Sequence, residues 1–211
     1  YYLYNQSYKN MNENKSLIDI KQNPLDLFDK WFEEAKLKEI NDPNAMNLAT
    51  VSNNFHPTSR MVLLKSYDVD GFVFYTNLDS KKGNAIKNNS QVALNFYWKS
   101  MQRQVCIEGE ARIISQKEAD KYFNSRPRNS RISAWASKQS SELKNREELE
   151  SRVAEFNNKF EGSKISRPKN WTGFVVKPKL IEFWQKMPFR LHDRTEFVNV
   201  RNNWISRKLY P

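Results

Sequence analysis

The strongest constraint on the fold is a series of short β-type segments between residues 45 and 114, because turns rather than long helices connect most of them. The segments are rich in β-branched and aromatic residues, and turn signals such as Asn53-Asn54 and the stretch 68–71 separate them. Consecutive hairpins are typical of an antiparallel sheet or a closed barrel. Strands are therefore predicted over 45–52, 58–65, 72–76, 92–98 and 103–114.

Helix signals flank and interrupt this β-rich region. Asn23 followed by Pro24 predicts an N-cap with proline at the first helical position, and Ser115 with Glu118 forms a capping box. Helices are predicted over 24–40, 80–88, 115–126, 127–137 and 141–160, and further strands over 172–177, 180–185, 190–198 and 204–209. The predicted fold is mainly β and antiparallel, with flanking helices.

The chain shows no internal repeat and no Gly/Ser linker. Residues 1–22 are polar, rich in Asn and Tyr, and lack a clear period, which predicts a flexible N-terminal arm. Residues 23–211 are predicted to form a single domain, since 211 residues suit one large domain.

Composition excludes several classes of protein. The single cysteine, Cys106, cannot form an internal disulfide, and two histidines with one cysteine cannot build a conventional zinc site, so no metal site is expected. No apolar run reaches the roughly 18–20 residues of a membrane span, and the first residues lack the pattern of a secretory signal. A soluble, cytoplasmic protein is expected.

The net charge of +11 leaves two kinds of partner open. A strongly basic chain is typical of nucleic-acid binding, and also of proteins that hold small phosphorylated ligands. Here the lysines are scattered among acidic residues, with no run of five like charges. Glycine-rich phosphate loops and serine nucleophile elbows are also absent from the sequence. If the chain is an enzyme, a bound cofactor is expected to supply the difficult chemistry.

Hydroxyl and cationic residues recur at positions suited to anions. Ser80, Lys81 and Lys82 open the predicted helix that follows strand 72–76, and a helix N-terminus attracts anions. Tyr122, Arg126 and Ser130 follow at spacings of four, and all three can donate hydrogen bonds to a phosphate. Taken singly, each group is equally compatible with a solvated helix cap or an ordinary strand end.

A third basic group lies near the C-terminus. If 190–198 is a strand, Arg190, His192 and Arg194 share one face, because side chains alternate along a strand. Neighbouring like charges destabilise a sheet. The pattern therefore indicates either a face fully in water or a face that binds an anion.

Several of these segments occur in a characteristic order: 23–25, 60–65, 74–77, 103–105, 122–127, 134–140 and 184–194. In order and residue identity they resemble the FMN-dependent pyridoxamine/pyridoxine 5′-phosphate oxidase family, over about residues 23–211. The resemblance implies an FMN-binding split β-barrel that works as a homodimer, with FMN at the subunit interface. It also implies oxidation of pyridoxamine and pyridoxine 5′-phosphates to pyridoxal 5′-phosphate, with O2 reduced to H2O2. Neither nucleic acid nor membrane would be a partner.

The resemblance also implies roles for individual residues. Arg190 and His192 would be catalytic and lie over the substrate ring. The substrate would be bound by Lys65, Tyr122, Arg126, Ser130, Arg190 and His192. The FMN site would comprise Arg60, Met61, Val62, Leu63, Leu64, Lys65, Tyr75, Thr76, Lys81, Lys82, Gln104, Gln139, Ser140, Trp184 and Arg194.

Three features depart from the family pattern. Lys81 stands where arginine is more usual, so the charge is kept but a bidentate fork is lost, and lower flavin affinity is expected. Lys186 stands where glycine is usual, which alters the turn toward Arg190. The arm lacks a clear Arg-x-x-Tyr element, and Tyr4 and Tyr8 remain unassigned. Two alternatives stay open: a related split-barrel flavoprotein that reduces another acceptor, and a nucleic-acid-binding barrel without flavin.

Overall fold

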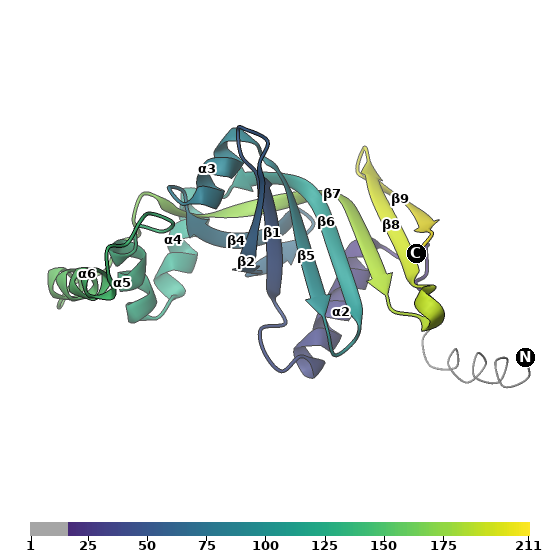
Figure 1. Ribbon diagram of the computed structural model, residues 1–211, viewed down its shortest axis with the longest axis horizontal. Helices are drawn as coiled ribbons and strands as arrows, with labels where there is room; N and C mark the ends of the chain where they lie inside the picture. The colour runs from purple at the N-terminus through teal and green to yellow at the C-terminus, as the bar shows by residue number, and fades with distance from the viewer. Residues whose placement is uncertain (1–16) are drawn as a thin grey trace, which may run out of the picture.

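The structure is a computed structural model, and it describes residues 17–211 (Figure 1). Nine strands in these residues form one curled sheet in the order β2-β1-β5-β6-β7-β4-β3, with β8 paired to β7 and β9 paired to β8. Every pairing is antiparallel. The predicted antiparallel, mainly β fold with flanking helices is confirmed.

The strands are β1 (Ala45–Val51), β2 (Pro57–Leu63), β3 (Ser66–Asp68), β4 (Gly71–Asn77), β5 (Gln91–Trp98), β6 (Arg103–Ile113), β7 (Trp171–Gln185), β8 (Asp193–Val200) and β9 (Asn203–Leu209). The helices are α2 (Pro24–Lys38), α3 (Lys81–Asn88), α4 (Gln116–Ser125), α5 (Arg128–Ala136) and α6 (Arg146–Lys159), with a short 3-10 turn, η1 (Pro188–Arg190).

Strand β7 joins the two halves of the sheet, because one of its edges pairs with two different strands. Its first half pairs with β4 and its second half with β8, while β6 pairs along most of the opposite edge. The β6 register shifts between Glu108 and Gly109, opposite Pro178, and a proline cannot donate to the ladder. The sequence predicted two strands here, over 172–177 and 180–185. The bulge instead lets one continuous strand pass the proline.

Helix α2 supplies one wall of the main core. Its first turn is capped by the Asn23 side chain, which accepts a 2.8 Å hydrogen bond from the amide of Leu25, with Pro24 next in sequence. The apolar face of α2 packs on the sheet. Phe28 is fully buried and meets Phe72 edge to face, with ring centroids 4.9 Å apart.

Asn23→Ala is expected to lower the free energy of unfolding by about 1 kcal/mol, because the first turn loses its side-chain acceptor. Denaturant unfolding monitored by circular dichroism measures the change. Lys30→Ala, at an exposed position in the same helix, is the matched control and should stay within about 0.5 kcal/mol of the parent. Equal stabilities for the two variants would contradict a capping role for Asn23.

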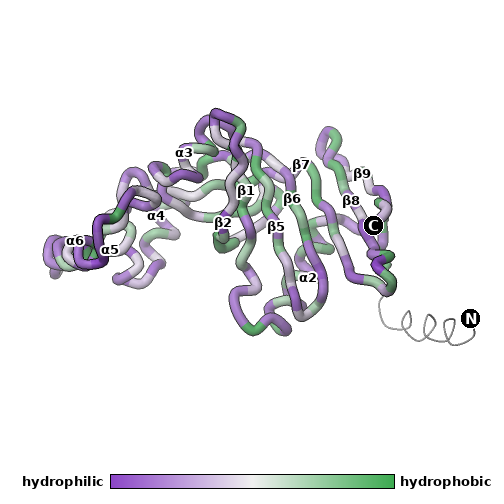
Figure 2. The backbone as a smooth tube through the Cα atoms, in the orientation of Figure 1, coloured by the Kyte–Doolittle hydropathy of each residue, from purple (hydrophilic) through white to green (hydrophobic). Residues whose placement is uncertain are grey.

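A smaller core lies under α4, α5 and α6. It contains Phe123, Ile132, Ile165 and Trp171. No residue of α6 within the described chain is fully buried, and Figure 2 shows the helix to be mainly hydrophilic. The prediction that this helix begins at residue 141 is wrong: it begins at Arg146, where the Asn145 side chain accepts from the amide of Glu148.

The last part of the predicted arm contacts the sheet. Ile18 is buried, its amide donates to Asp193, and its carbonyl oxygen accepts from Lys208. Residues 1–16, including Tyr4 and Tyr8, lie outside the described residues. Within residues 17–211, no helix has the length and apolar character needed to cross a membrane.

Candidate active site

A cavity of about 470 Å³ opens where the C-terminal end of β4 meets α4 and α5. It brings together the four residues that were predicted to bind the phosphate group of a substrate: Lys65, Tyr122, Arg126 and Ser130. Its lining also includes Met61, Val62, Leu63, Tyr75, Thr76, Lys82, Pro127, Gln139 and Trp171. Tyr122 lies on α4, Ser130 on α5 and Arg126 at the junction before Pro127. Lys65 comes from the connection between β2 and β3.

Arg126 is a partly buried cation in this lining. Its guanidinium lies 4.8 Å from the ring centroid of Trp171, and loss of solvent lowers its pKa below the usual range. Nη1 is buried and has no hydrogen-bond partner among residues 17–211. A buried N–H group without an acceptor is costly, and an anion in the cavity would relieve that cost.

An aromatic stack forms the floor beneath Arg126. The rings of Tyr75 and Tyr122 are stacked with centroids 3.9 Å apart, and Trp171 continues the stack 5.2 Å from Tyr75. Burial, followed by the charges of Tyr122 and Glu118, raises the pKa of Tyr75 to about 12. Its hydroxyl therefore stays protonated at neutral pH and can donate. Trp171 was not among the predicted site residues, because its only local signal is an aromatic residue at a strand start.

A second basic cluster lies at the N-terminus of α3. Ser80 caps this helix by accepting from the amide of Gly83. A side chain at Gly83 would meet the carbonyl oxygens of Asn77 and Leu78 within 2.6 Å. Glycine at this position therefore lets the helix start lie directly against the end of β4.

Gln139 connects this cluster to the helical end of the molecule. Its Oε1 accepts from Thr76 Oγ1 at 3.1 Å and from Lys82 Nζ at 3.0 Å. Burial, and secondly the charge of Arg60, lower the pKa of Lys82. Two cations close enough to perturb each other mark a position that favours an anion.

Arg60 is held in place by its own strand pair. Its guanidinium donates to the carbonyl oxygen of Leu48 at 3.1 Å, to Thr50 at 2.8 Å and to Thr58 at 2.6 Å. A guanidinium has five N–H donors, so about two remain for a ligand. Leu64, Lys81 and Ser140 also lie outside the cavity lining: the Leu64 side chain is buried in the main core, and Lys81 and Ser140 are exposed.

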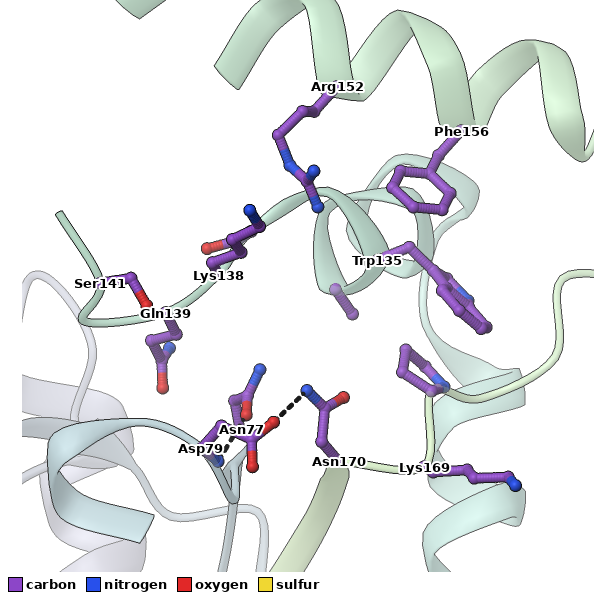
Figure 3. Close-up of a pocket in the computed structure, with 13 residues that line it drawn as sticks. Asn77, Asp79, Trp135, Lys138, Gln139, Ser141, Arg152, Phe156, Lys169 and Asn170 are labelled. Atoms are coloured by element: carbon purple, nitrogen blue, oxygen red, sulfur yellow. Dashed lines mark hydrogen bonds between the residues drawn. The ribbon is translucent and has the colours of Figure 1, made fainter. Parts of the chain in front are cut away.

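Figure 3 shows a neighbouring cavity of about 600 Å³ on the other side of Gln139. Asp79 and Asn170 are hydrogen-bonded across it at 2.7 Å, and Trp135 and Phe156 supply aromatic surface. The Gln139 side chain extends from the α5–α6 connection toward the segment that carries Asn77 and Asp79 (Figure 3). Gln139 therefore belongs to the lining of both cavities.

The remaining predicted residues form a second group on the other half of the sheet. Gln104, Trp184 and Arg194 are neighbours across β6, β7 and β8, so they share one face. Arg194 donates to both carboxylate oxygens of Glu182, at 2.7 and 3.1 Å. This pairing orients the guanidinium and raises its pKa, chiefly through the hydrogen bond.

The prediction that Arg190, His192 and Arg194 share one strand face is wrong. Strand β8 begins only at Asp193, and the chain before it forms η1, in which Phe189 and Arg190 have φ values of 55° and 64°. Left-handed backbone at two consecutive non-glycine residues cannot continue a strand. Arg190 is therefore carried on a tight turn, where its side chain is exposed.

His192 lies beside that turn with a defined orientation. Its ring centroid is 4.6 Å from that of Trp184, and Nδ1 accepts a 3.3 Å hydrogen bond from the amide of Met187. Partial burial, followed by the charges of Arg190 and Lys186, lowers the pKa of His192. The lowered pKa favours the neutral imidazole, and because Nδ1 accepts this hydrogen bond, the proton of the neutral ring lies on Nε2.

The two groups lie far apart in one chain. Figure 1 shows α4 and α5 at one end of the molecule, and β8, β9 and η1 at the opposite end. Consequently Lys65, Tyr122, Arg126 and Ser130 do not share a cavity with Arg190 and His192 of the same chain.

Comparison with protein families gives two successive matches. Residues 32–160 match a family described as pyridoxamine 5′-phosphate oxidase. Residues 171–211 match the pyridoxine 5′-phosphate oxidase C-terminal dimerisation region. Together the matches cover most of the chain, including both groups of candidate residues.

Curated relatives agree with these matches. The pyridoxine/pyridoxamine 5′-phosphate oxidase of Bartonella quintana is 52% identical over 193 residues, covering 90% of this chain and 93% of the relative. The protein of the same name from Caulobacter vibrioides is 49% identical over 190 residues, covering 90% and 86%.

Solved structures share the fold. PhzG from Burkholderia lata, in complex with tetrahydrophenazine-1-carboxylic acid, matches with a TM-score of 0.84 and 28% identity, covering 95% of this chain and 96% of that one. An FMN-binding protein from Nostoc punctiforme matches with a TM-score of 0.71 and 15% identity, covering 90% and 99%. At that identity the second likeness concerns the fold alone. The expected split β-barrel is confirmed.

Proposed function

Because this chain belongs to the pyridoxamine 5′-phosphate oxidase family, we propose that it oxidises pyridoxamine 5′-phosphate and pyridoxine 5′-phosphate to pyridoxal 5′-phosphate with FMN as cofactor. The amine substrate reacts with O2 and water to give aldehyde, ammonia and H2O2, and the alcohol reacts with O2 to give aldehyde and H2O2. The observation that carries the assignment is the cavity that gathers Lys65, Tyr122, Arg126 and Ser130.

The residues present fit FMN and a phosphorylated substrate together. Two sets of anion donors lie around the end of β4: Arg60 and Lys82 with the α3 start, and Lys65 with Arg126. The buried, unpartnered Nη1 of Arg126 favours an anion in the second set. We assign the first set to the FMN phosphate and the second to the substrate phosphate.

The match of residues 171–211 to a dimerisation region supports a homodimer, and we propose that FMN lies at the subunit interface. The outer sheet face carries exposed apolar side chains from Met61, Leu63 and Tyr97. Strand registers put these on the same face as Gln104 and Trp184. An apolar face of this kind suits a second copy of the chain. In such a dimer, Arg190 and His192 of one subunit complete the cavity of the other.

The protein's contribution to turnover is to bind and orient. FMN, when bound, accepts the hydride equivalent from the substrate 4′ carbon and passes the electrons to O2. Lys65, Tyr122, Arg126 and Ser130 fix the phosphate end, so that the ring has one orientation. Arg190 supplies positive charge beside the ring, and neutral His192 donates a hydrogen bond through Nε2. We further propose that residues 23–211 act as one domain and residues 1–22 as its arm.

The direct test is to incubate the purified protein with FMN and pyridoxamine 5′-phosphate in air and to measure H2O2 and aldehyde. We expect both products in equal amounts. Flavin binding without oxidation of either B6 phosphate would favour a flavoprotein that reduces another acceptor. Salt-sensitive binding to single-stranded nucleic acid without flavin binding would favour the nucleic-acid alternative.

Arg60→Ala is expected to weaken FMN binding about tenfold, since one charge-assisted hydrogen bond to a phosphate contributes about 1.5 kcal/mol. Quenching of flavin fluorescence during titration of the apoprotein measures the change. Lys87→Ala, an exposed cation further along α3 paired with Asp79, is the matched control and should bind FMN normally. Unchanged affinity in Arg60→Ala would remove Arg60 from the cofactor site.

A further inference from the structure

A buried amide, Gln185, lies at the end of β7 immediately before the turn that carries the proposed catalytic residues. Only 1% of its surface is exposed, so its polar atoms must be satisfied by the protein. Arg103, its register partner on β6, donates from Nε to Gln185 Oε1 at 3.0 Å. This is a charge-assisted bond away from bulk water, and it fixes which way the amide points.

Arg103 is itself immobilised by helix α2. Its Nη1 donates to Glu34 at 2.9 Å, and its guanidinium lies 4.5 Å from the ring centroid of Trp31. The Gln185 oxygen is thus held by a rigid partner, and its amide nitrogen faces Met187, 4.0 Å from the sulfur atom. The backbone after β7 is also held, because the Lys186 amide donates to the carbonyl oxygen of Gln102.

Met187 connects the Gln185–Arg103 pair, which we call the anchor of the loop, to His192. Its amide donates to Nδ1 of His192, while Trp184 packs on the imidazole ring. We propose that Gln185 and Arg103 are positioning residues, which hold the 186–192 loop so that His192 keeps its proton on Nε2 and presents it to the substrate. The part that concerns catalysis rests on the proposed function, whereas the coupling to the imidazole does not.

The proposal predicts that loss of the Gln185–Arg103 contact changes both the tautomer and the pKa of His192. If the anchor is lost, the Met187 amide no longer holds Nδ1, and the imidazole becomes more solvated and samples both tautomers. Burial and the charges of Arg190 and Lys186 lower the pKa of His192 in the intact protein. Loosening the loop should therefore raise that pKa toward its ordinary value of about 6.5. The acid limb of the activity profile should move to higher pH.

The chain is well suited to this measurement because it has two histidines, His56 and His192. Imidazole 15N and 1H NMR spectra across a pH titration give the tautomer and the pKa directly, and His56→Asn assigns the signals. The variants are Gln185→Leu, which removes both polar atoms, and Gln185→Glu, which keeps an acceptor for Arg103. Arg103→Lys loses the Nε donor. Arg112→Lys, on the same strand but exposed and paired with Glu110, is the matched control.

We expect Gln185→Leu and Arg103→Lys to mix the His192 tautomers, raise its pKa and lower kcat/KM about tenfold to 100-fold, because small misplacements are costly. FMN affinity should not change. Gln185→Glu should restore the parent tautomer and most of the activity. If Gln185→Leu does not fold, Arg103→Lys carries the test alone.

An unchanged His192 spectrum and unchanged kcat/KM in Gln185→Leu, or in Arg103→Lys where that variant carries the test, would overturn the proposal, as would equal losses in Arg112→Lys. Failure of the parent protein to oxidise either B6 phosphate would instead overturn the proposed function. The spectra would then still report whether Gln185 and Arg103 control the imidazole.

Discussion

Replacing Arg126 by alanine is expected to raise the KM for pyridoxamine 5′-phosphate about 100-fold while leaving FMN affinity unchanged. The guanidinium is held over Trp171, and its buried Nη1 lacks a partner within residues 17–211. Two charge-assisted bonds to a phosphate at about 1.5 kcal/mol each correspond to about 3 kcal/mol, or roughly 100-fold in affinity. Steady-state kinetics measures KM, and flavin titration measures the cofactor.

A comparison of pyridoxamine 5′-phosphate with unphosphorylated pyridoxamine tests whether Arg126 acts through the phosphate. Parent protein should prefer pyridoxamine 5′-phosphate over pyridoxamine, and Arg126→Ala should lose most of that preference because the lost interaction is with the phosphate. Arg128→Ala is the matched control, since Arg128 lies two residues away, is exposed and donates to the carbonyl oxygens of Asn157 and Phe160. An unaltered preference in Arg126→Ala would assign the cavity to a different ligand.

Removal of the Arg190 side chain is expected to lower kcat at least 100-fold, the scale seen when one preorganised electrostatic donor is deleted. FMN affinity should be preserved, because the substitution leaves intact Arg60, Lys82 and the start of α3, which are the groups assigned to the FMN phosphate. Stopped-flow reduction of the flavin under anaerobic conditions measures the chemical step.

The experiment has to distinguish the effect on kcat of losing the Arg190 charge from the effect of straining the backbone, since Arg190 has a φ of 64°. Arg190→Gly keeps that conformation at no steric cost, whereas Arg190→Ala strains it. Both variants should be equally slow if the guanidinium matters. Arg201→Ala, another exposed arginine at positive φ in the β8–β9 turn, is the control for strain alone. A fast Arg190→Gly variant would assign the effect to the backbone.

Much of the fold could be predicted because local signals agree with the tertiary structure. The Asn23 cap and the Ser115–Glu118 capping box both form as expected. The failures arise where a long-range contact overrides the local pattern. Two strands were predicted, over 172–177 and 180–185, but a bulge against β6 keeps β7 continuous past Pro178. Strand β3 was missed because three residues carry too little pattern.

The candidate site could likewise be predicted where local spacing was informative, and could not be predicted where distant contacts decide the structure. The spacing of Tyr122, Arg126 and Ser130 indicated phosphate donors, and the three line one cavity. The alternation of Arg190, His192 and Arg194 indicated a strand, but nothing in that local pattern reveals two left-handed residues. Trp171 and the shared acceptor Gln139 depend on contacts between distant segments, which a single sequence does not display.

The separation of the two residue groups within one chain (Figure 1) has a genetic consequence. In the proposed dimer, chains carrying Arg126→Ala and Arg190→Ala, each with a greatly reduced kcat/KM alone, should complement one another when they are co-expressed. Random reassortment makes half of the dimers hybrids, and in each hybrid one of the two pockets combines an intact Arg126 with an intact Arg190. Roughly a quarter of the parental rate should return, so two damaged alleles would together support growth that neither supports alone.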